Sequence, residues 1–64
     1  MGLYFEIVLK NMKTKEEISE EHFTLKMAEH AWREVTEVAV KLAQEYFEKD
    51  KYWYLAEIRD VTRR

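Results

Sequence analysis

The longest regular pattern in this chain is MAEHAWREVTEVAVKLAQEYFEK, residues 27–49. At ~100° per residue, its apolar side chains gather on one arc of roughly 160° of a helical wheel. The members of this arc are Met27, Ala28, Ala31, Trp32, Val35, Val38, Ala39, Leu42, Ala43 and Tyr46. Charged and amide side chains occupy the opposite side. The pattern therefore predicts one long amphipathic helix that starts near residues 24–27 and buries a single face.

Two apolar residues of this segment fall outside the arc. Val40 and Phe47 lie seven positions apart, just beyond Ala43, on the side that should meet solvent. One interpretation is a wide apolar stripe in which Phe47 folds back over the last helical turn. The other is a second contact strip, formed with Thr36 and Ala43, that meets another chain.

Residues 2–10 alternate as a β-strand does, because successive side chains of a strand point to opposite faces. One face carries Leu3, Phe5, Ile7 and Leu9, and the other carries Tyr4, Glu6, Val8 and Lys10. Aromatic and β-branched residues strengthen the prediction of a strand. Its second face is only partly polar.

The second strand is expected within residues 16–25, after a polar reversal at residues 11–15. Phe23 and Leu25 share a face in a strand but not in a helix. Pairing Phe23 with Ile7 and Leu25 with Phe5 places apolar residues on one face. This register predicts a loop of several residues, or a bulge, between the two strands.

Residues 52–62 read as the third strand, after a short charged break at residues 49–51 that contains no Gly or Pro. We assign Tyr54, Ala56 and Ile58 to the side that faces the helix, because Ala56 leaves room for a close approach. Trp53 and Leu55 then lie on the other side, although they would serve as core residues nearly as well, so the alternative assignment stays open.

The element order is β-β-α-β, which predicts an α+β fold: a three-stranded sheet of order 2-1-3 with the long helix on one face. A right-handed crossover through the helix would set the third strand parallel to the first. With no Pro and one Gly, nothing divides the chain, so one domain is expected over residues 1–64. The order is common among small phage and bacterial proteins, but no motif names a family.

Composition limits the classes of function. The chain has 64 residues and no Cys, so packing alone must stabilise it, and a second copy would help. Eleven Lys and Arg against thirteen Asp and Glu give a formal charge of −2, which argues against a dedicated duplex-DNA binder. No apolar run is long enough to span a membrane. The absence of Cys suits a reducing cytoplasm, and we expect a cytoplasmic protein.

Residues that often carry chemistry are present but not clustered. His22 and His30 have no metal-ligand spacing, and the acidic run of Glu16, Glu17, Glu20 and Glu21 lacks the glycine of a calcium loop. Glu6 and Glu57 are expected on the open sheet face beside Lys10 and Arg59, which predicts a charge ladder rather than a pair for acid–base catalysis. We therefore predict no enzyme, no metal and no cofactor.

The surplus of apolar residues predicts a non-catalytic protein-interaction module. It would self-associate as a homodimer and bind a second macromolecule through the open sheet face or the Val40/Phe47 strip. The interface candidates are Tyr4, Val8, Trp53, Leu55, Val40 and Phe47.

Two alternatives stay open. The first is binding of single-stranded nucleic acid on the open sheet face, where aromatic rings would stack on bases and basic residues would contact phosphates. Its candidates are Tyr4, Lys10, Trp53, Arg59, Arg63 and Arg64. The second is an acidic decoy for a nucleic-acid site on another protein.

Overall fold

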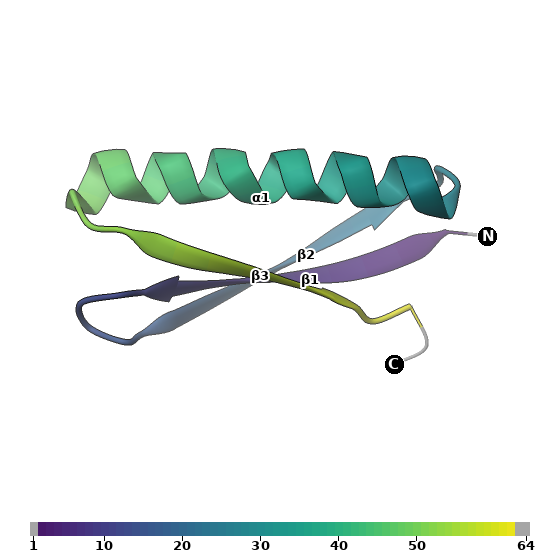
Figure 1. The fold of residues 1–64 in the computed structure, drawn as a ribbon. Coiled ribbons are helices and arrows are strands. Elements are labelled where there is room, and N and C mark those ends of the chain that lie inside the picture. The colour runs from purple at the N-terminus through teal and green to yellow at the C-terminus, as the bar shows by residue number, and fades with distance from the viewer. Residues whose placement is uncertain (1, 63–64) are drawn as a thin grey trace.

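The computed structural model describes residues 2–62 and contains three strands and one helix. Strands β1 (Leu3–Asn11) and β2 (Glu17–Thr24) form a hairpin, helix α1 (Ala28–Asp50) follows, and β3 (Tyr54–Asp60) completes the sheet. The strand order is β2-β1-β3, with α1 along one face (Figure 1). The α+β fold and the sheet order predicted from the sequence are therefore confirmed.

The core lies between α1 and the central strand β1. Phe5, Ile7 and Leu9 are fully buried, and Val35 of the helix is buried among them. The other buried helix residues are Ala31 and Ala39, with Val38, Leu42, Ala43 and Tyr46 partly buried beside them. These residues belong to the apolar arc, because the 3.6-residue period of the helix aligns them on one side.

Both ends of the predicted helix lie within a few residues of the observed ones. The helix begins at Ala28, after Met27 as the N-cap residue in an extended conformation. Met27 makes no side-chain cap hydrogen bond. At the other end Lys51 adopts the left-handed conformation, with φ of 60°, and donates its backbone N–H to Phe47 O. This conformation ends the helix without a glycine.

The predicted direction of the third strand is wrong. Strand β3 pairs antiparallel with β1, with Ile58 opposite Ile7 and Ala56 opposite Leu9. The helix connects β2, not β1, to β3, so the crossover makes β3 parallel to β2, with β1 between them (Figure 1). The predicted helix-facing side of β3 is the observed one, since Tyr54 and Ile58 pack against the core.

The predicted register of the hairpin is also wrong. Ile7 lies opposite Glu20 rather than Phe23, a difference of three residues. Because side chains alternate with a period of two, this odd shift moves Phe23 to the open face, opposite Tyr4. Leu25 lies beyond the end of β2 and is exposed.

The turn explains this register. The Asn11 side chain accepts hydrogen bonds from the backbone N–H groups of Lys13 and Thr14, at 2.8 and 3.1 Å. Lys15 adopts a left-handed conformation with φ of 67°, and Asn11 N–H donates to Glu16 O at 2.9 Å. The expected loop of several residues is confirmed. Its local hydrogen bonds outweigh the apolar pairing that Phe23 and Leu25 favoured.

Candidate protein-interaction surface

An apolar groove runs between α1 and the edge strand β3. The helix contributes Val40, Ala43 and Phe47, and the β3 side contributes Trp53 and Ala56, around a volume of about 530 Å³. Val40 is 52% exposed and Trp53 is 73% exposed. The rings of Phe47 and Trp53 lie 4.8 Å apart between centroids. Two interface candidates from the helix and one from the segment just before β3 thus meet on one surface.

The shape of the groove comes from small residues in its middle and large residues beside them. Ala43 and Ala56 are too short to fill the space between helix and strand, whereas Phe47 and Trp53 stand at one end of it. Phe47 is half-buried and contacts Trp53, which follows the last helical turn. The first of the two interpretations of the Val40/Phe47 strip is therefore incomplete, because Val40 stays half exposed.

Polar contacts hold the end of the groove in place. Trp53 O accepts a hydrogen bond from Met12 N at 3.1 Å, so the segment before β3 is tied to the hairpin. The Tyr54 hydroxyl donates to the Asp50 carboxylate and accepts from Asn11 Nδ2 at 3.0 Å. The bond to Asp50 raises the pKa of Tyr54 above its usual value. The helix end, the hairpin turn and β3 are thereby joined around one phenol.

The open face of the sheet carries charges where a contiguous apolar patch was expected. Arg59 Nε donates to Glu57 Oε1 at 3.2 Å, and Arg59 Nη1 lies 3.8 Å from Glu6 Oε1. Ser19 Oγ donates to the other oxygen of Glu6 at 2.7 Å. Opposite Ser19, Val8 is only 7% exposed. The part of the predicted charge ladder formed by Glu6, Glu57 and Arg59 is present, and Val8 does not offer a surface to a partner.

The remaining candidates lie at opposite ends of the molecule. Tyr4 packs against Phe23, with tilted rings whose centroids are 4.6 Å apart, whereas Trp53 is next to Met12 at the far end of β1. Tyr4 and Met12 are eight positions apart along β1 and its end, roughly 26 Å at about 3.3 Å per residue. Leu55, 58% exposed, is opposite Lys10. The Tyr4–Phe23 pair was missed because the expected register placed Phe23 on the helix side.

This arrangement does not favour the nucleic-acid alternative. Tyr4 and Trp53 do not share a stacking surface, and Arg59 is engaged by two carboxylates. Lys10 lies opposite Glu17 on β2. Arg63 and Arg64, the other two basic candidates, lie outside the described residues.

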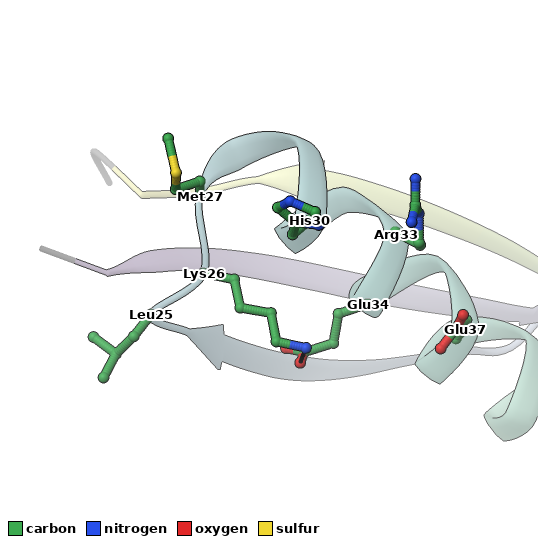
Figure 2. A pocket seen from close by; sticks show the side chains of 7 residues that line it. All are labelled: Leu25, Lys26, Met27, His30, Arg33, Glu34 and Glu37. Atoms are coloured by element: carbon green, nitrogen blue, oxygen red, sulfur yellow. Dashed lines mark ion pairs between the residues drawn. The ribbon is translucent and has the colours of Figure 1, made fainter.

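A second cavity, of about 660 Å³, lies beside the first turns of α1 (Figure 2). Its lining combines exposed apolar and charged side chains: Leu25, Lys26, Met27, His30, Arg33, Glu34 and Glu37. Glu34 is 2.8 Å from His22 Nε2 and 2.9 Å from Lys26 Nζ. These hydrogen bonds, led by the one from His22, lower the pKa of Glu34 to about 2. The cluster ties β2 and the following loop to the helix, and it keeps Glu34 ionised beside Lys26.

Within residues 2–62, no group of three His, Cys, Asp or Glu residues is arranged to hold a metal ion. Over the same residues, no helix is both long and apolar enough to cross a membrane. Comparison with known proteins gives no match to a family model, a curated protein or a solved structure.

Proposed function

We propose that this protein is a non-catalytic interaction module that self-associates through the groove between α1 and β3. The observation that carries the proposal is the convergence of Val40, Phe47 and Trp53 at one sheet edge, where two of the three are more than half exposed. Such a patch is typical of a surface that meets another protein. A second copy of the chain is the occupant that we propose.

The choice of a second copy rests on the two edges of the sheet. Strand β2 carries Glu17, Glu20 and Glu21 along its length, and a two-fold pairing of that edge would bring like charges together. Strand β3 instead carries Glu57 and Arg59, charges of both signs separated by one residue on the same face. An edge of that kind is complementary to an inverted copy of itself.

Self-association also matches the size of the core. Only seven hydrophobic residues are buried in the described part of the chain. Oligomerisation is one of the ways in which domains of this size add to the stability of a small core. Burial of Val40 and Trp53 against a second copy would extend the core across the β3 edge.

Sedimentation velocity from nanomolar to high micromolar concentration tests the proposal. We expect the sedimentation coefficient to rise from that of a monomer to that of a dimer within this range. In the same samples, the emission of Trp53 should shift to shorter wavelength as its ring leaves water, while a Trp53→Phe variant should lose that component. A monomer at every concentration refutes the proposal.

A further inference from the structure

We infer that the partner copy pairs with β3 as an antiparallel extension of the sheet, centred on Ile58. The inference rests on the proposed self-association and specifies its geometry: two three-stranded sheets join into one sheet of six strands. In this register Ile58 lies opposite its own symmetry mate. Glu57 of each copy lies opposite Arg59 of the other.

The backbone of β3 is oriented for this pairing. Trp53 directs its carbonyl oxygen to Met12, which follows β1, and Val61 directs its N–H to Tyr4 of β1, at 3.1 and 2.9 Å. Since the N–H and C=O groups of successive strand residues point to alternate sides, the residues at even positions point theirs away from β1. Ile58 is one of these, so a two-fold axis at Ile58 joins the two outer edges through a hydrogen-bonded pair.

The side chains select this register among its neighbours. A two-fold axis perpendicular to the sheet keeps each face, so residues opposite one another must be an even number of positions apart. Centring the pair on Glu57 would place two carboxylates together, and centring it on Arg59 would place two guanidinium groups together. Centring it on Ala56 would place Glu57 opposite the apolar Leu55. Centring it on Ile58 forms two Glu57–Arg59 contacts in non-hydrogen-bonded positions, where side chains approach most closely.

The helices are compatible with the joined sheet. The same axis keeps both α1 helices on one face, where each packs on β3 and β1. Neighbouring strands are about 4.8 Å apart, so helix axes above the midline between β1 and β3 would lie roughly 10 Å from each other. That is an ordinary helix-packing distance. In this arrangement the exposed side of Val40, which lines the groove, faces the partner helix.

Charge-reversal variants test this pairing. Glu57→Arg would set two guanidinium groups against each other at both cross-strand contacts of the dimer, and Arg59→Glu would set two carboxylates against each other at the same places. Each variant alone should dimerise about tenfold or more weakly than the wild type. An equimolar mixture of the two should form a mixed dimer, because every cross-strand contact is then between opposite charges. Native mass spectrometry resolves this species, since the two variants differ in mass.

The outcomes separate this inference from the proposed function. Recovery of dimer only in the mixture supports the Ile58-centred pairing and shows that both variants fold. If the wild type dimerises and both single variants dimerise equally well, the pairing is refuted while self-association through the groove stands. If the single variants are weakened and the mixture fails to recover, the register is refuted. A wild type that never dimerises overturns the proposed function itself.

Discussion

Substitution of Val40 gives the sharpest test of the groove, because this residue contributes little to the monomer. It is 52% exposed on α1. Full burial of a Val side chain is worth about 1.5–3 kcal/mol, so covering the exposed half should contribute about 1 kcal/mol per protomer. A symmetric dimer contains two copies, and Val40→Ala should therefore weaken it by about 2 kcal/mol, or about 30-fold in Kd.

Val40→Glu should have a larger effect. A carboxylate placed in the closed interface without a partner costs several kcal/mol, so the dimer should weaken by more than about 100-fold. The monomer should stay folded, with a stability change of about 0.5 kcal/mol or less, because the site is open to water before association. Lys41→Glu is the matched control: it adds a carboxylate at the next, exposed position and should change dimerisation far less.

The assay is sedimentation equilibrium for Kd, with thermal unfolding at low protein concentration to measure monomer stability. If Val40→Glu and the wild type have the same Kd, the groove is not the contact surface. If Val40→Glu unfolds the monomer, Val40 has a structural role that its exposure does not indicate.

Three further predictions concern the monomer. Val35→Ala should lower the free energy of unfolding by about 2 kcal/mol, since Val35 is fully buried. Val40→Ala on the same helix should change it by about 0.5 kcal/mol or less. Chemical denaturation measures both values. Asn11→Ala should lower the free energy of unfolding by about 2–3 kcal/mol, because it removes two turn hydrogen bonds and one to Tyr54. Asn11→Asp keeps the acceptor for the two turn bonds and should lower it less. Equal losses for the two variants would contradict the role assigned to the turn. Because the pKa of Glu34 is lowered from 4.5 to about 2 by its hydrogen bonds, led by the one to His22, these contacts of the carboxylate stabilise the fold above pH 4.5, and that stability should be lost as the pH falls toward 2. Glu34→Gln should flatten this acid-side decline in urea unfolding curves, and an unchanged slope would show that the ion pairs contribute nothing.

The periodic elements were predictable from the residues alone. The apolar arc of residues 27–49 identified α1 and its buried face, because a helix longer than six turns averages out individual exceptions. The strict alternation of residues 2–10 identified β1 and its buried side, because every second side chain of a strand points to the same face. The prediction that Tyr54 and Ile58 face the helix was also correct.

The hairpin register depended on a few local contacts that no periodicity reveals. Asn11 and the left-handed Lys15 fix the turn, and an odd shift then places Phe23 on the opposite face from the one predicted. The apolar pattern of residues 16–25 is weak, since four of them are glutamates. A turn with well-formed hydrogen bonds therefore decides the pairing.

The sequence by itself determined which segments form the helix and the sheet, and that more apolar surface exists than a small core buries. The tertiary structure decided where that surface lies. Val40, Phe47 and Trp53 are brought together by the left-handed residue Lys51 and by the antiparallel return of β3. Tyr4 does not belong to this surface because it lies at the other end of the sheet, against Phe23. Val8 does not belong to it because its side chain is buried. Helix and strand periodicity depends on residues that are close in the sequence, so it can be recognised from the sequence. Contact between a helix end and a strand edge depends on how the elements pack in space.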